Sequence, residues 1–155
     1  MKILIYSITA VFIVYVFLFT YLSFIAAKSR QPGAVPEKLK PCPDTPNCVC
    51  SEYENGKWFI QPFNFDEPKE TAWARLKTVI TSSGGKIEQA TDNYIWAIFK
   101  TKFWRFTDDV EFRLDADGKT IHVRSASRVG KGDLGANRKR VEELRQLFSV
   151  NKKQQ

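Results

Sequence analysis

Residues 121–140 read IHVRSASRVGKGDLGANRKR, and this stretch decides the fold of the chain. Alternating apolar residues at Ile121 and Val123 are typical of a strand, and the glycines at 130, 132 and 135 predict a loop after it. A basic helix follows, with Asp133 placed to cap its start. Free peptide N–H groups in such a loop and at a helix N-terminus can hold an anion. The stretch therefore predicts the last strand and helix of a domain, and the place of a binding site between them.

Basic side chains are concentrated in the same part of the chain. Residues 119–155 contain ten basic and three acidic side chains, whereas residues 31–118 contain eleven basic and fourteen acidic ones. This asymmetry predicts that the last quarter of the chain meets something anionic, such as lipid headgroups, nucleic acid or a phosphorylated or carboxylated ligand. A solvated basic helix face explains the same composition, and that alternative stays open.

The segment just upstream predicts a partner for the strand at 121. Residues 110–114 alternate between apolar and charged side chains, and residues 115–118 read DADG, a hairpin turn signal. Val110, Phe112 and Leu114 should then share a face with Ile121 and Val123. The opposite face gathers polar side chains: Asp109, Glu111, Arg113, His122 and Arg124. We expect these charges to pair across the strands.

The rest of the domain follows from turn signals and periodicity. A short strand at 57–60 precedes a helix that starts near Pro68 and ends at Gly84 and Gly85. Two strands follow at about 86–90 and 93–101, and the last helix runs to about Phe148 with Asn137 on its buried stripe. The predicted class is α+β: one two-layer domain in the order strand, helix, four strands, helix, with a mostly antiparallel sheet and both helices on one face.

The N-terminus is strongly apolar. Residues 3–27 contain no charged side chain, and a helix needs roughly 20 apolar residues to cross a bilayer. We therefore expect a transmembrane anchor over residues 1–28, with a cleaved signal peptide as the alternative. Counting basic residues on the two sides favours a cytoplasmic domain. The cysteines and the family likeness below favour a single-pass inner-membrane protein with a periplasmic, extracytoplasmic domain.

A proline-rich linker over residues 29–47 contains the first cysteine, and the α+β domain is expected over 48–150 with a disordered tail at 151–155. Cys42, Cys48 and Cys50 are the three cysteines of the chain. A Cys42–Cys48 disulfide, which needs an oxidising compartment, is the favoured interpretation. A zinc site using the distant His122 and three unpaired thiols remain alternatives.

Several motifs resemble one family. They are CPDTPNCV at 42–49, TKFWRFTDDVEF at 101–112, RSASRVG at 124–130, DLG at 133–135 and NR at 137–138. This is the bacterial and plastid domain family of unknown function numbered fourteen ninety-nine, and the likeness spans about residues 41–148. The resemblance implies export or membrane anchoring but no activity, and Cys50 stands where it leads us to expect a serine. It gives weight to the polar motif residues Asp108, Asp109, Arg124, Ser125, Ser127, Arg128, Asp133, Asn137 and Arg138.

The first functional hypothesis is a membrane-tethered binding or assembly module. Its ligand would be an anionic small molecule or an acidic segment of a partner protein, because the planar guanidinium of arginine holds carboxylate or phosphate with two bonds. The expected ligand-binding residues are Arg124, Ser125, Ser127, Arg128, Gly130, Asp133, Asn137 and Arg138. Secondary candidates are Asp108, Asp109 and His122.

The second hypothesis is a hydrolase that uses Asp108 and Asp109 as acid and base, or Ser125 activated by His122. Strand residues that are one or three positions apart point to opposite faces, so Asp108 is separated from Asp109 and Ser125 from His122. The sequence also lacks a nucleophile elbow and a Walker phosphate loop, so catalysis is the weaker hypothesis. No cofactor or metal is expected. A third hypothesis, a cytoplasmic-side binder of nucleic acid or anionic lipid, rests on basic charge alone and conflicts with an exported domain.

Overall fold

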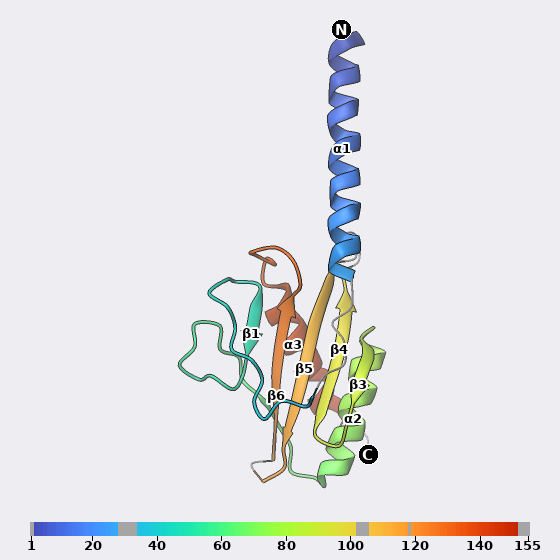
Figure 1. The fold of residues 1–155 in the computed structure, drawn as a ribbon. Helices are drawn as coiled ribbons and strands as arrows, with labels where there is room; N and C mark the ends of the chain where they lie inside the picture. The colour runs from blue at the N-terminus through green and yellow to red at the C-terminus, as the bar shows by residue number, and fades with distance from the viewer. Residues whose placement is uncertain (1, 28–33, 102–105, 118, 152–155) are drawn as a thin grey trace.

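The computed structural model describes residues 2–27, 34–101, 106–117 and 119–151. Its elements follow the chain in Figure 1: α1 (Lys2–Ala27), β1 (Cys48–Cys50), β2 (Phe63–Asn64), α2 (Lys69–Ser82), β3 (Lys86–Ala90), β4 (Tyr94–Lys100), β5 (Thr107–Asp115), β6 (Thr120–Ser127) and α3 (Ala136–Asn151). The α+β class with an antiparallel sheet agrees with the prediction. The predicted strand at 57–60 is replaced by the short strands β1 and β2, and Phe59 makes only an isolated bridge with Cys50.

The sheet is ordered β1-β6-β5-β4-β3, and β2 pairs with the far end of β6. All pairs of named strands are antiparallel. Opposite residues in the β5–β6 hairpin include Phe112 with Val123 and Glu111 with Arg124. This register places Val110, Phe112 and Leu114 on one face with Ile121 and Val123, as the alternating pattern predicts, whereas a shift by one residue would turn one strand's apolar side chains out of the core.

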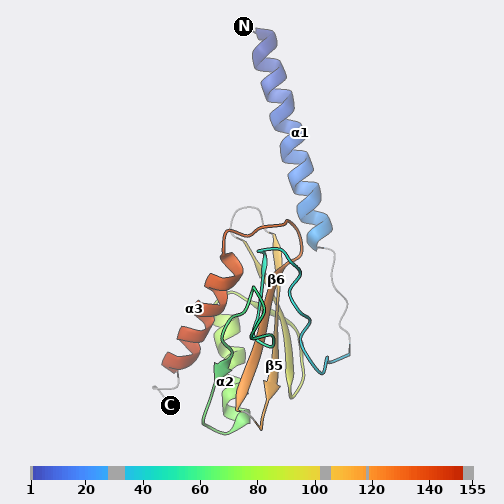
Figure 2. The ribbon, with the colours of Figure 1, turned by 90° about the vertical axis from the view of Figure 1, so that its left-hand side faces the viewer.

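Helices α2 and α3 cover one face of the sheet, as Figure 2 shows. The main core lies between them and the sheet. Phe63, from β2, packs edge-on against Phe112 of β5 and Phe148 of α3, with ring centroids 5.8 and 5.6 Å apart. Gly84 ends α2 with a φ of 82°, as its position after the apolar stripe predicts. The next glycine, Gly85, lies against the ring of Phe99, where a larger residue does not fit.

The other face of the sheet carries a smaller apolar cluster, which we call the second cluster: Leu39, Cys50, Tyr94 and Trp96. Strand β4 is therefore buried on both faces, with Ile95 and Ala97 in the main core. Leu39 precedes β1 in the chain and is fully buried. The segment before β1 thus completes the domain instead of serving only as a spacer.

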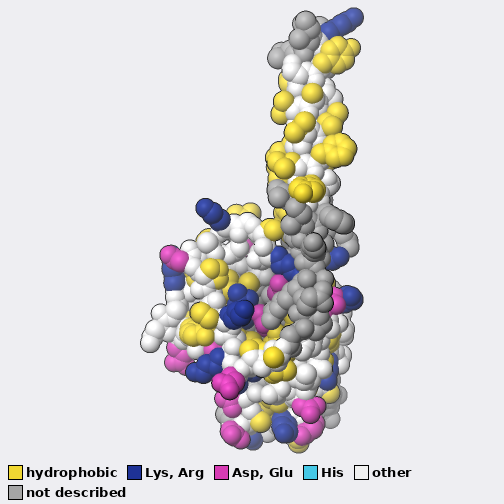
Figure 3. Space-filling view, viewed as in Figure 1, with side chains coloured by type: hydrophobic (Ala, Val, Ile, Leu, Met, Phe, Trp, Pro, Cys, Tyr) yellow, Lys and Arg dark blue, Asp and Glu magenta, His cyan; other side chains and the backbone are white. Residues whose placement is uncertain are grey.

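Helix α1 projects from the end of the sheet, and between Tyr6 and Tyr21 it carries exposed apolar side chains (Figures 1 and 3). Within the part of the chain that the structure describes, no helix has both the length and the apolar character needed to span a membrane. The predicted transmembrane anchor over residues 1–28 is therefore wrong. Parts of the predicted anchor, linker and tail, at 1, 28–33 and 152–155, lie outside the described residues.

Candidate functional site

Strand alternation divides the predicted site residues between the two faces of the sheet. On β6, Ser125 and Ser127 lie on the helix-covered face, whereas His122 and Arg124 lie on the opposite face. On β5, Asp108 pairs in register with Ser127, and its neighbour Asp109 lies on the opposite face. The predicted residues therefore form two groups and not one site.

On the face away from the helices, the two central arginines have carboxylate partners within the chain. Arg124 Nη1 donates to Glu111 Oε2 at 3.2 Å, and Arg128 donates from Nε and Nη2 to the two oxygens of Asp109 at 3.0 and 2.8 Å. The side chains of Arg124 and Arg128 are only 15% and 12% exposed. Both guanidinium groups are therefore largely buried and paired with a carboxylate of the neighbouring strand, as the expected cross-strand pairing requires.

Aromatic residues of β4 complete these pairs. Tyr94 donates its hydroxyl proton to Glu111 Oε1 at 2.7 Å, and Trp96 Nε1 donates to Asp109 Oδ1 at the same distance. Glu111 is only 3% exposed, so its charge is compensated by Arg124 and Tyr94 and not by water. The arrangement holds one buried and one partly buried carboxylate in fixed positions.

On the helix-covered face, Asn137 is the centre of a polar network. Its Oδ1 accepts protons from Ser125 Oγ at 2.5 Å and Arg140 Nη1 at 2.8 Å. Its Nδ2 lies within hydrogen-bonding distance of Asn47 O, Ser127 Oγ and Asp133 Oδ2. Asn137 is fully buried, as its place on the buried stripe of the last helix predicted, and a buried amide requires such partners.

The same network fixes the loop between β6 and α3. Asp133 accepts the backbone N–H of Gly135 at 2.8 Å and of Asn137 at 2.9 Å, so it caps α3 as predicted. Asn47 Nδ2 donates to Gly130 O at 2.6 Å and ties the loop to the segment before β1. Leu134, between these anchors, has a φ of 54° and a fully exposed side chain.

A cavity of about 650 Å³ lies between this loop and the end of α1. Its wall includes two aromatic rings, Phe19 of α1 and Phe106 before β5, which lie 5.8 Å apart by their centroids. Its remaining lining residues are Thr101, Asp108, Ser127, Val129, Gly130, Gly132, Asp133, Leu134 and Ala136. The cavity thus brings together four predicted candidates: Asp108, Ser127, Gly130 and Asp133. Arg124, Ser125, Arg128, Asn137, Arg138, Asp109 and His122 do not line it.

Neither predicted catalytic pair is assembled. Asp108 Oδ2 accepts a hydrogen bond from Arg140 Nη2 at 2.6 Å on one face of β5, and Asp109 accepts hydrogen bonds from Arg128 on the other. His122 Nδ1 lies 3.3 Å from Ser51 Oγ and not beside Ser125. Burial lowers the pKa of His122, which keeps the ring neutral to lower pH. Arg138 donates to the carbonyl of Phe59 at 2.8 Å and sits apart from both groups.

Ser51, Glu52 and Arg140 were not among the predicted site residues. Arg140 joins Asp108 to Asn137, and Glu52 Oε1 accepts Arg113 Nε at 2.5 Å while its Oε2 accepts the backbone N–H of Leu39. Asn47 was also missed, although it belongs to the motif at 42–49 that was recognised. These residues act as long-range connectors, and no spacing rule reveals such partners.

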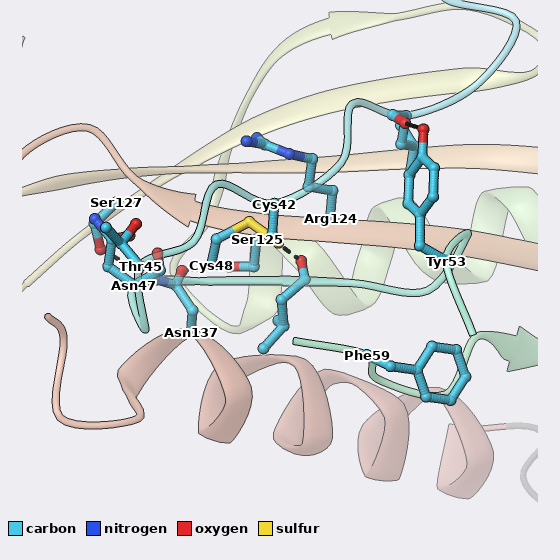
Figure 4. The surroundings of a disulfide bond; sticks show 12 residues. Cys42, Thr45, Asn47, Cys48, Tyr53, Phe59, Arg124, Ser125, Ser127 and Asn137 are labelled. Atoms are coloured by element: carbon cyan, nitrogen blue, oxygen red, sulfur yellow. Dashed lines mark hydrogen bonds between the residues drawn. A yellow bond between two sulfur atoms is a disulfide. The ribbon is translucent and has the colours of Figure 1, made fainter. Parts of the chain in front are cut away.

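The disulfide between Cys42 and Cys48 is formed, with Cα atoms 5.6 Å apart, as predicted (Figure 4). Cys50 is a buried free thiol, and burial raises its pKa. Among the described residues, no group of three or more His, Cys, Asp or Glu side chains is placed to hold a metal ion. The disulfide also removes two of the three thiols from the zinc alternative.

Comparison with known families agrees with the motif likeness. Residues 102–105 of the motif at 101–112 lie outside the described part of the structure. The motifs at 42–49, 124–130, 133–135 and 137–138 are described in full. A search of curated proteins found no match to this chain. Residues 38–148 match the family model described as "Protein of unknown function (DUF1499)", and the chain therefore belongs to this family.

Proposed function

We propose that this protein binds an anionic amphiphile, whose acyl chain occupies the cavity between the loop at 130–135 and the rings of Phe19 and Phe106. The cavity itself carries the proposal. Its volume of about 650 Å³ lies within the range of about 300–1,000 Å³ that is typical of small-molecule sites. Phe19, Phe106 and Val129 give it an apolar wall, as such sites have.

The backbone of Leu134 supports the same conclusion. A non-glycine residue at positive φ costs about 1–2 kcal/mol, and Leu134 buries no apolar surface within the chain that would offset this. Strained residues of this kind gather at binding sites, where surrounding contacts hold them. Here Asp133 and Gly135 hold the turn, so that an apolar side chain stands at the cavity rim facing solvent.

The two charged lining residues of the cavity are the carboxylates Asp108 and Asp133, which are held by Arg140 and by backbone N–H groups at the start of α3. The support for an anionic head group comes from the basic side chains around them. Lys131 is exposed on the same loop, one residue beyond Gly130 of the cavity wall. The basic balance of residues 119–155 acts in the same direction. In this proposal, Arg124 and Arg128 stabilise the scaffold and are not ligand contacts. The Cys42–Cys48 disulfide supports an extracytoplasmic location for the binding.

Native mass spectrometry of the full chain with palmitate or with palmitoyl lysophosphatidylglycerol tests the proposal. A Val129→Trp substitution fills the cavity, whereas Val150→Trp adds the same side chain at an exposed site near the end of α3. We expect Val129→Trp to weaken uptake by more than about tenfold and Val150→Trp to bind as the wild type does.

The two lipids separate the sources of the acyl chain. Uptake of palmitate alone identifies a free fatty acid as the ligand, and uptake of the lysolipid alone identifies a phospholipid. The proposal fails if neither lipid binds the wild type, or if both tryptophan variants bind as the wild type does.

A further inference from the structure

The cysteine cluster is independent of the lipid cavity. Strand β1 fixes two of its members, because Cys48 pairs with Ala126 and Cys50 with Arg124 in the ladder with β6. Residues two apart in a strand lie on the same face, about 6.6 Å apart. Disulfides span Cα distances of about 4.4–6.8 Å, so Cys48 and Cys50 are at the limit and their parallel side chains do not meet. A bond between these two would require β1 to leave the sheet.

Cys42 is placed differently. It lies in the loop before β1, is bonded to Cys48, and packs against the second cluster, to which Cys50 belongs. Cys42 and Cys50 also line one cavity of about 270 Å³. A cysteine of the disulfide and the free cysteine therefore border the same space, while Cys48 is held by its strand.

We propose that Cys50 exchanges with the Cys42–Cys48 disulfide, so that the chain has two alternative disulfides. Cys50 loses its proton to solvent, and its thiolate sulfur attacks Sγ of Cys42. The Cys42–Cys48 bond breaks as the Cys42–Cys50 bond forms, and Cys48 leaves as a thiolate that takes up a proton. One disulfide and one thiol are present before and after, so no oxidant or reductant is consumed.

The exchange would affect the loop network beside Cys48, and the burial of Cys50 limits its rate. Cys48 is joined in sequence to Asn47, whose side chain and carbonyl hold Gly130 and Asn137. Freeing Cys48 therefore loosens the covalent anchor next to this network. Burial raises the pKa of the Cys50 thiol, with Glu52 and Glu111 acting in the same direction, against Arg124 and a backbone hydrogen bond. Exchange is accordingly slow at neutral pH, because only the thiolate attacks.

Two single substitutions in the full chain test the geometry. Cys50→Ser leaves only the Cys42–Cys48 pair, and Cys48→Ser leaves only the Cys42–Cys50 pair. After air oxidation, denaturation and N-ethylmaleimide labelling, we expect neither variant to take up label, because each forms its disulfide. Two labels on Cys48→Ser beside none on Cys50→Ser overturn the proposal.

The wild type supplies the measurement that does not depend on a variant folding. The native protein is incubated with a trace of glutathione at mildly alkaline pH, quenched with acid, labelled, digested and mapped. We expect label on Cys48 in a measurable fraction, accompanied by a peptide linked through Cys42 and Cys50. Label confined to Cys50 at every time, while fully reduced protein labels at all three positions, overturns the proposal.

Discussion

Ser125 Oγ donates to Asn137 Oδ1 at 2.5 Å, and neither residue has any exposed surface. Ser125 lies in β6 and Asn137 in the first turn of α3, so the bond closes over the whole loop at 126–136. Arg140 shares the same acceptor and reaches Asp108 on β5. The most characteristic motif residues of the chain therefore hold its loop in place, and the loop in turn forms the cavity.

Replacing Asn137 by Ala should destabilise the domain strongly. The change leaves Ser125 Oγ and one Arg140 donor without their acceptor, and each unsatisfied buried group costs about 1–3 kcal/mol. We expect the free energy of unfolding to fall by about 3 kcal/mol in urea titrations followed by circular dichroism. Lys139→Ala is the control, since Lys139 is 79% exposed on the same helix and should change stability by less than about 0.5 kcal/mol. Equal stabilities for the two variants would contradict this role for Asn137.

Replacing Gly85 with a larger residue should disturb the packing at the end of α2. A Cβ at this position would lie 2.5 Å from Phe99 Cζ and 2.8 Å from Ile80 Cγ2. Because both neighbours belong to the core, Gly85→Ala should lower the free energy of unfolding by about 1–3 kcal/mol. The matched change Gly132→Ala meets no atom within 4 Å and should leave the melting temperature unchanged or slightly raised. A harmless Gly85→Ala would show that Phe99 can move aside.

The sheet could be predicted largely from local patterns. Alternation at 110–114 and 121–123, with the turn signal between them, was enough to predict a hairpin and the side chains that share each of its faces, although not the length of its loop. The same alternation predicted that Asp108 and Asp109 lie on opposite faces, as do Ser125 and His122. Side chains alternate along a strand, so burying one face determines the face of every residue. Glycine at 84 marked the end of α2 for a similarly local reason, its positive φ.

The candidate site could not be predicted in the same way. Asn47 and Asn137 are 90 residues apart, and Phe19 and Leu134 border one cavity from opposite ends of the chain. Such contacts depend on how complete elements pack, which single-sequence spacing does not encode. Arg124 in β6 and Arg128 just after it show the same limit. Their number predicted an anion site, and the sequence did not reveal that Glu111 and Asp109 pair with them.

Stability should depend on pH through His122. Burial lowers the pKa of His122 in the folded protein below the ordinary value of 6.5, with Arg113 acting in the same direction and Glu52 and Asp115 opposing. The folded state therefore binds a proton less readily than the unfolded chain does. Stability is fully present above pH 6.5 and is lost as the pH falls below it, through the folded pKa.

The measurement compares wild type with His122→Asn between about pH 7.5 and about pH 5. Carboxylates shared by both proteins contribute equally, so the difference isolates the histidine. We expect the free energy of unfolding of the wild type to fall more steeply with acid than that of the variant. Parallel curves would mean that His122 is protonated in the folded protein as easily as in the unfolded one.

Arg124 and Glu111 give the sharpest test of whether the arginines serve structure or ligand. Removing one member of a buried ion pair typically costs about 3–5 kcal/mol, because the other charge is left without compensation. Glu111 is 3% exposed, so Arg124→Met should lower the free energy of unfolding by about 3 kcal/mol. The double variant Glu111→Gln/Arg124→Met removes both charges, while the Gln carbonyl can still accept the Tyr94 hydroxyl. It should recover most of the lost stability, since neutral replacements of buried pairs are often tolerated. If Arg124→Met unfolds like the wild type, the guanidinium is not needed by Glu111, and a role for Arg124 in holding an external anion regains support.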